Sequence, residues 1–202
     1  MQEKILVTIF RFNPDGSSRG RYETYEVPYF SHMDVVDVLR YIRDNIDHSL
    51  AFRYSCEEGK CGLCSVVVNG KPVLACKRTV QKGESLTIEP LPNFPIIRDL
   101  IVDRDGYYDE LKRLQDVVEI RSSRKARIAQ DKETDYIECA NCVECGVCSV
   151  SCPAALAGHH PLTGPVGFLQ SVRVALFGGP STLSPDGSSD LFNCLQCGQC
   201  HT

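Results

Sequence analysis

The 202-residue sequence contains no tryptophan, only two methionines, and no apolar run that approaches the ~18 residues of a membrane-spanning helix. A secretory signal is also missing, because the opening residues MQEKILVTIF have neither a basic segment nor a small-residue cleavage site. The net charge of −4 gives no support to binding of nucleic acid. These absences predict a soluble, intracellular chain with no membrane span of its own and no nucleic-acid partner.

Cysteine, in contrast, is abundant, with 12 residues in three groups at positions 56–76, 139–152 and 194–200. The content of about 6% is below the ~8–10% of a dense disulfide scaffold. Because the spacings are short and no secretory signal precedes them, the pattern favours metal ligands over disulfides.

The N-terminal region has the pattern of strands around one helix. Residues 4–12 and 22–30 each predict a strand, and the turn-forming stretch NPDGSS lies between them. A helix is predicted within residues 31–47, with Ser31 or Asp34 as its N-cap. Its apolar residues recur at helical spacing, and they are Val35, Val38, Leu39, Ile42 and Ile46.

Further strands follow a cysteine-rich loop. Two short strands flank an Asn69-Gly70 turn, and residues 84–91 predict a last strand. The order ββαβββ around a cysteine loop is that of a β-grasp ferredoxin.

The C-terminal half has a different pattern. Residues 107–128 are charged and helix-prone, and a later helix has Val166, Leu169, Val172 and Leu176 on one face. We therefore expect an α+β protein. Residues 1–104 are predicted to form a β-grasp, plant-type ferredoxin domain, and residues 105–202 a mostly α-helical, bacterial-ferredoxin-like domain with two cubane-type clusters.

The first cysteine group has the C-x₄-C-x₂-C spacing and distant fourth cysteine of a plant-type [2Fe–2S] site. Gly59 and Gly62 would let the loop wrap closely around a cluster. Zinc sites favour paired short spacings, so a structural zinc protein is the weaker alternative. The predicted ligands are Cys56, Cys61, Cys64 and Cys76.

The second group has the bacterial ferredoxin spacing C-x₂-C-x₂-C-x₃-C-P, formed by Cys142, Cys145, Cys148, Cys152 and Pro153. In two-cluster ferredoxins the first three cysteines of such a run hold one cluster, and the fourth reaches the other. Another cysteine, at position 139, lies outside this pattern. It is predicted to be a buried free cysteine, with cluster ligation as the alternative.

The third group, Cys194, Cys197 and Cys200, stands at the end of the sequence. By the crossing rule Cys152 completes this group. The middle cluster, a [4Fe–4S] cluster, then needs a further ligand from beyond Thr202. We therefore expect the natural chain to continue with a Cys-Pro pair.

Five stretches together resemble the iron–sulfur subunits of succinate dehydrogenase and fumarate reductase over essentially the whole sequence. The resemblance implies an electron-transfer subunit of an oxidoreductase complex, with no substrate chemistry on this chain. It implies an FAD-bearing dicarboxylate subunit and a membrane-anchor or quinone-reactive partner, on the cytoplasmic side of the membrane. The matching stretches are FRFNPD, FRYSCEEGKCGLCSVVVNGKPVLAC, IEPLPNFPIIRDLIVDRDGYY, CVECGVCSVSCP and LTGPVGFLQSVR.

The sequence departs from this family at two places. The resemblance implies a [3Fe–4S] third cluster held by Cys152, Cys194 and Cys200. Many members have an apolar residue at the position of Cys197, so the extra thiol here favours a [4Fe–4S] cluster.

The second departure concerns the quinone. Ubiquinone-reactive members carry a tryptophan and a histidine where this chain has Ala157 and Leu195. Menaquinone or a thiol-reactive partner therefore competes with ubiquinone. An iron–sulfur relay subunit of another flavoenzyme, or of a heterodisulfide-type reductase, remains the alternative function.

Overall fold

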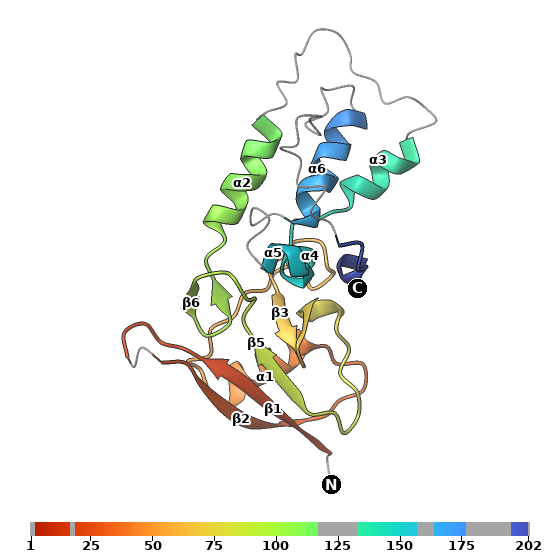
Figure 1. The fold of residues 1–202 in the computed structure, drawn as a ribbon. Helices are drawn as coiled ribbons and strands as arrows, with labels where there is room; N and C mark the ends of the chain where they lie inside the picture. The colour runs from red at the N-terminus through yellow and green to blue at the C-terminus, as the bar shows by residue number, and fades with distance from the viewer. Residues whose placement is uncertain (1–2, 17–18, 117–132, 157–163, 177–194, 202) are drawn as a thin grey trace. The chain divides into compact units, whose positions relative to one another are not determined.

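The computed structural model describes residues 3–16, 19–116, 133–156, 164–176 and 195–201 (Figure 1). The chain divides into two compact units, Met1–Asp103 and Arg104–Thr202. The first unit combines a sheet with a helix, and the regular elements described in the second unit are helical. The predicted α+β class is therefore confirmed.

A five-stranded mixed sheet forms the centre of the first unit, with the strand order β2-β1-β5-β3-β4. The second strand pairs antiparallel with β1, while β5 runs parallel to β1 and antiparallel to β3. All the strands predicted in this region are present. Their bounds are β1 Lys4–Arg11, β2 Arg21–Pro28, β3 Ser65–Val68, β4 Lys71–Leu74 and β5 Leu86–Glu89.

Helix α1 (Val35–Asn45) begins at the predicted cap, Asp34. The Asp34 carboxylate accepts a hydrogen bond from the amide of Asp37, and the Asp37 carboxylate accepts one from the amide of Asp34. This reciprocal capping box satisfies two amides that the first turn leaves without helical partners.

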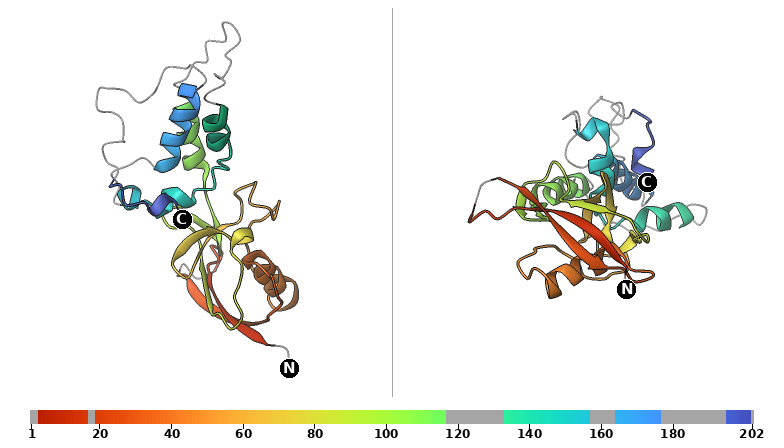
Figure 2. Two further views of the ribbon diagram at one scale, coloured as in Figure 1. Left: turned by 90° about the vertical axis from the view of Figure 1, so that its right-hand side faces the viewer. Right: turned by 90° about the horizontal axis from the view of Figure 1, so that it is seen from below.

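The apolar face of α1 packs into the same core as the sheet, and Figure 2 shows the helix beside the sheet. Four of its five predicted core residues are buried, namely Val35, Val38, Leu39 and Ile42. The fifth residue of the pattern, Ile46, is 46% exposed. This residue is the C-cap, where the backbone leaves the helical conformation and turns the side chain away from the core.

A short hairpin follows the sheet in a segment that the sequence did not predict to be regular. It consists of β6 (Ile96–Arg98) and β7 (Ile101–Val102), with a register shift between Ile96 and Arg98. Strands of three and two residues are too short to show a period of two in the sequence.

In the second unit, α6 (Pro165–Leu176) packs against both α2 (Asp105–Asp116) and α3 (Glu133–Ala140) (Figure 1). The predicted helix at 107–128 is present up to residue 116, and its remainder lies outside the described residues. Three shorter helices carry or flank the cysteines: α4 (Val147–Ser151), α5 (Pro153–Leu156) and the 3₁₀ helix η4 (Gln199–His201). Within the described parts of the chain, we find no helix with the length and apolar character to cross a bilayer.

The buried face of α6 differs from the predicted one. Val166 is buried as expected, but Val172 is 39% exposed, and the polar side chain of Gln170 is buried instead. The predicted helix is thus present, but its apolar stripe is only partly buried. A buried glutamine requires hydrogen-bond partners, and here one comes from the cysteine-bearing loop and the other from α6 itself.

Candidate functional site

The first cysteine group is assembled by the β3–β4 hairpin and the loop that precedes it. Cys64 lies directly before β3, and Cys76 lies in the 3₁₀ helix η1 (Ala75–Lys77) directly after β4. Because these strands pair in register, with Ser65 opposite Leu74, the two cysteines meet at the open end of the hairpin. Both are buried, and their Sγ atoms are 3.4 Å apart.

The loop that carries Cys56 and Cys61 directs backbone N–H groups at sulfur. The amides of Glu58 and Lys60 donate to Cys56 Sγ, at 3.4 and 3.2 Å. These bonds lower the pKa of the Cys56 thiol to about 7. The loop reaches this shape through residues in the left-handed conformation, which are Glu57, Gly59 and Gly62, with φ of 57°, 76° and 69°.

Burial acts on Cys64 in the opposite direction. The pKa of this thiol is raised to about 12, mainly by burial and also by the neighbouring sulfurs of Cys76 and Cys61. Several thiolates in so small a space repel one another, and a cationic centre would relieve that repulsion. The donor set of soft sulfurs, backed by amide donors, fits the predicted [2Fe–2S] cluster.

The second cysteine group lies on a loop between α3 and α4. Cys139 is half-buried in the last turn of α3, and its carbonyl accepts the amide of Cys142 at 3.4 Å. The pKa of Cys148 is raised to about 11, mainly by burial and also by the charges of Cys145, Cys142 and Cys200. The thiols of the run are therefore close together, and Cys200 of the last run is close to them.

Tyr107 of α2 lies against the same thiols. Its side chain is 1% exposed. Burial raises the pKa of Tyr107, and the charges of Cys148, Cys145 and Cys142 raise it further. Spacing rules did not identify this residue, because its link to the cysteines arises only when α2 packs beside their loop.

The third group is brought to Cys152 by the fold. A pocket of about 260 Å³ is lined by Cys152, Cys197 and Cys200. Its other lining residues are mainly apolar and include Pro153, Phe168 and Leu195. Three predicted ligands of the third cluster, drawn from two runs, thus meet at one cavity. Cys194 and Ala157 lie outside the described residues.

The last two cysteine runs share one backbone geometry. In each, the residue before the middle cysteine is left-handed: Glu144 has φ of 52° and Gln196 has φ of 51°. In each, the glycine after that cysteine is left-handed too, with φ of 80° at Gly146 and 72° at Gly198. A helical turn then begins, α4 in one run and η4 in the other. Cys197 therefore occupies the same backbone position as Cys145.

These thiols do not converge on one point. Across the described residues, no three Cys, His, Asp or Glu side chains form a group that could hold a single metal ion. The thiol ligands of an iron–sulfur cluster are shared among two or more irons, so they need not all meet at one point.

The sequence is similar to known iron–sulfur proteins. Residues 6–109 match the family model of a 2Fe-2S iron-sulfur cluster binding domain. The chain is 31% identical over 216 residues to the fumarate reductase iron-sulfur subunit of Haemophilus influenzae, across 96% of this chain and 84% of that protein. It is also 31% identical to a subunit of the fumarate reductase (CoM/CoB) of Methanothermobacter marburgensis, a match that spans 97% of this chain and only 40% of that protein.

A solved structure has the same fold. The similarity is to a chain of the Mycobacterium smegmatis Sdh1 complex in the apo form, with a TM-score of 0.73 and 24% sequence identity. The match covers 88% of this chain and 75% of that chain.

Proposed function

Because this chain belongs to the succinate dehydrogenase/fumarate reductase family of iron–sulfur subunits, we propose that it relays single electrons from site to site along its cysteine groups. In this proposal one end of the relay meets an FAD-bearing dicarboxylate subunit. The other end meets a quinone- or thiol-reactive partner at the membrane. The observation that supports the proposal is the first cysteine group, in which Cys64 Sγ lies 3.4 Å from Cys76 Sγ and two loop amides donate to Cys56 Sγ, within residues matched by the 2Fe-2S family model.

Bound iron–sulfur clusters would supply a reversible one-electron change that no side chain of this sequence provides. The residues of the chain perform three other tasks. Cysteines would hold iron, amides of the first loop donate hydrogen bonds to sulfur, and apolar residues line the pocket of the third group. Cys56, Cys61, Cys64 and Cys76 would hold a [2Fe–2S] cluster, and Cys142, Cys145 and Cys148 a [4Fe–4S] cluster.

For the third site we propose a [4Fe–4S] rather than a [3Fe–4S] cluster, with Cys152, Cys194, Cys197 and Cys200 as ligands. The shared backbone geometry of the last two runs supports this, because it gives Cys197 the position of Cys145. The pocket supports it too, since Cys197 lines it together with Cys152 and Cys200.

The third site is tested by electron paramagnetic resonance (EPR) of the air-oxidised protein. An oxidised three-iron cluster is paramagnetic, whereas an oxidised four-iron cluster is silent. The three cysteines assigned to the middle cluster leave one of its irons without a thiol, so this cluster can itself give a three-iron signal in air. We therefore expect Cys197→Ala to add a second three-iron signal to the spectrum of the unaltered chain. Cys139→Ala is the matched control and should leave the spectrum unchanged. A Cys197→Ala spectrum identical to that of the unaltered chain would contradict this assignment.

The relay itself is tested by reoxidation. The chain is reduced with dithionite and mixed with fumarate, with or without the FAD-bearing partner subunit. We expect fumarate to reoxidise the clusters only when that partner is present. A colourless, EPR-silent chain with bound zinc would support the structural zinc alternative instead.

A thiol-reactive donor is the second candidate for the outer partner. The observation in its favour is the similarity to the fumarate reductase (CoM/CoB) of Methanothermobacter marburgensis over 97% of this chain. We would compare a menaquinol analogue with a thiol pair as reductants of the assembled complex. Cluster reduction by thiols alone favours the second candidate, and reduction by the quinol alone excludes it.

A further inference from the structure

Gln170 is a buried polar residue on α6, with 3% of its surface exposed. Its Nε2 donates a hydrogen bond to Glu144 Oε1 at 2.7 Å, and its Oε1 accepts one from Arg173 Nη1 at 3.1 Å. Both ends of the amide are therefore used. The orientation of the amide is fixed, because only its nitrogen can donate to a carboxylate and only its oxygen can accept from a guanidinium.

Glu144 connects these hydrogen bonds to the cysteine loop between α3 and α4. It stands between Cys142 and Cys145, and it adopts a left-handed backbone conformation that is unfavourable for residues other than glycine. A bond from α6 to its carboxylate holds the loop in this shape. The hydrogen bonds from Arg173 to Gln170 and from Gln170 to Glu144 thus connect α6 to the backbone between two predicted ligands, Cys142 and Cys145.

Arg173 adds a charge to the same place. Burial raises the pKa of Cys142, and the charge of Glu144 raises it too, whereas the guanidinium of Arg173 acts in the opposite direction and favours a negative charge on the sulfur. A fixed positive charge beside a redox centre stabilises the reduced form, which carries one more negative charge.

We propose that Gln170 is a positioning residue for the middle iron–sulfur cluster, holding its cysteine loop through Glu144 and keeping the charge of Arg173 beside it. This inference rests on the proposed binding of that cluster by Cys142, Cys145 and Cys148. Gln170 does not ligate iron, and its effect on the cluster passes through its two hydrogen-bond partners.

These hydrogen bonds can be tested by exchanging the amide and the carboxylate between positions 170 and 144. Gln170→Glu alone sets two carboxylates against each other in a buried place. The double variant Glu144→Gln/Gln170→Glu keeps the net charge and restores both bonds. The new amide at position 144 donates to the new carboxylate at position 170, which still accepts from Arg173. Val172→Thr, on the exposed side of α6, is the control.

The readouts are iron and sulfide content, an EPR-monitored redox titration of the full chain, and hydrogen exchange at the amides of residues 143–148 in iron-depleted protein. The [2Fe–2S] cluster of the first unit is an internal reference in every sample. For Gln170→Glu we expect faster exchange in this loop and about a tenfold shift of the middle cluster toward its oxidised form, or ~59 mV. The reference cluster should not move, and the double variant should regain the original values.

Arg173→Met is a second variant that does not depend on the fold tolerating a new buried carboxylate. It should shift the middle cluster toward its oxidised form with the reference unchanged. The proposal is overturned if Gln170→Glu behaves like Val172→Thr, or if the double variant is no better than the single one. It is also overturned if both clusters move together. Failure of the proposed function is distinguishable, because the unaltered chain would then contain no iron or sulfide at the middle site.

Discussion

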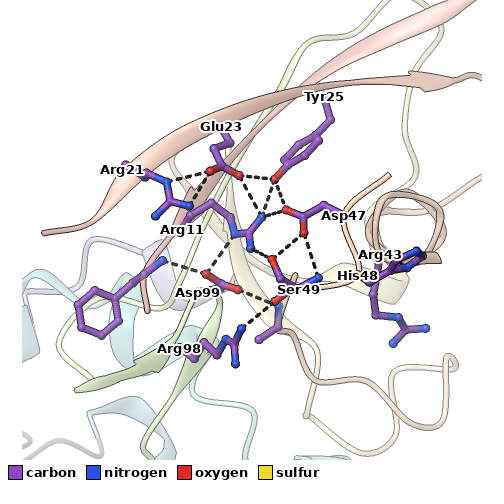
Figure 3. A network of polar contacts seen from close by, with 12 residues as sticks. Arg11, Arg21, Glu23, Tyr25, Arg43, Asp47, His48, Ser49, Arg98 and Asp99 are labelled. Atoms are coloured by element: carbon purple, nitrogen blue, oxygen red, sulfur yellow. Dashed lines mark hydrogen bonds and ion pairs between the residues drawn. The ribbon is translucent and has the colours of Figure 1, made fainter. Parts of the chain in front are cut away.

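The guanidinium Nε of Arg11 lies 3.1 Å from Oδ1 of Asp99, although 88 positions separate the two residues. Both side chains are buried, with 4% and 3% of their surfaces exposed. Asp99 also accepts hydrogen bonds from the amides of Phe12 and Ala51, each at 2.9 Å (Figure 3). One carboxylate thus joins β1, the β6–β7 turn and the segment that leads into the first cysteine loop.

Removal of this carboxylate should destabilise the first unit strongly. Asp99→Ala leaves a buried guanidinium short of one partner and two amides without their acceptor, and we expect a loss of about 3–5 kcal/mol in the free energy of unfolding. Denaturant unfolding of the iron-free chain measures this loss.

Glu26→Ala is the control for that measurement. It removes an ion pair with Lys4 in which both side chains are largely exposed, at 61% and 59%. Exposed pairs contribute little to stability, so the free energy of unfolding should stay close to that of the unaltered chain. Similar losses for Asp99→Ala and Glu26→Ala would refute a structural role for the buried pair.

Arg11 also bonds to Asp47, and this contact makes the free energy of unfolding depend on pH. Burial opposes ionisation of Asp47, but hydrogen bonds from Ser49 and Arg11 outweigh burial and hold its pKa well below the ordinary value of 3.8. Because the folded-state pKa is lowered, the stabilisation is present above pH 3.8 and is lost as the pH falls below that value. Denaturant unfolding of iron-free protein between about pH 5 and pH 2 should show this loss. In Asp47→Asn the free energy of unfolding should depend less steeply on pH, by the equivalent of up to about one proton.

Asp44 provides the comparison for the acid series. Its pKa is also lowered, by Arg43, but the carboxylate is 53% exposed. In about 1 M salt Asp44→Asn should match the unaltered chain, because exposed pairs are screened, while Asp47→Asn should still differ. Equal behaviour of the two variants in salt would show that Asp47 is not shielded by the network.

Local signals in the sequence were sufficient for much of the first unit. Alternation predicted β1, the Asn69-Gly70 pair predicted the β3–β4 turn, and Asp34 was one of two predicted caps for α1. Each of these features depends on residues a few positions apart. Cysteine spacing likewise located the loops of the candidate sites, because three ligands of each cluster come from one short run, while the fourth comes from elsewhere in the sequence.

Features that depend on distant contacts could not be predicted in this way. Nothing near Asp99 in the sequence indicates Arg11, and nothing near Gln170 indicates Glu144. The exposed position of Val172 has the same origin, since the face of α6 that is buried depends on where the cysteine loop packs. Helical periodicity identified an apolar stripe, but the buried face of α6 also includes Gln170, which bonds to Glu144.

The conformation of Gly59 should matter for cluster assembly. Its φ is 76°, and an added Cβ would lie 2.5 Å from Cε of Lys77, a side chain that can move. Gly59→Ala should therefore cost about 1–2 kcal/mol of backbone strain and displace the amides that bond to Cys56. We expect the strain to lower the iron and sulfide content of the first site, measured per chain.

Gly83→Ala is the matched control for Gly59→Ala. Its φ is 72° and nothing lies within 4 Å of the added Cβ, so its backbone strain should be similar. Because Gly83 lies in the turn before β5, away from the cysteine loop, iron content should be unchanged. Equal iron content in both variants would show that the left-handed conformation at Gly59 is not needed for assembly.

Removal of iron should reveal very different reactivity in Cys56 and Cys64. The pKa of Cys56 is lowered to about 7 by the amides of Glu58 and Lys60, whereas burial raises the pKa of Cys64 to about 12. Only the thiolate reacts with iodoacetamide, so at pH 7 Cys56 should be alkylated at least about a hundredfold faster than Cys64 in chelator-treated protein. Peptide mass spectrometry over time measures both rates. Raising the pH from 6 to 8 should accelerate Cys56 until its thiol is fully ionised, while Cys64 remains slow. Equal rates at the two positions would show that the loop amides do not reach the Cys56 sulfur before the metal binds.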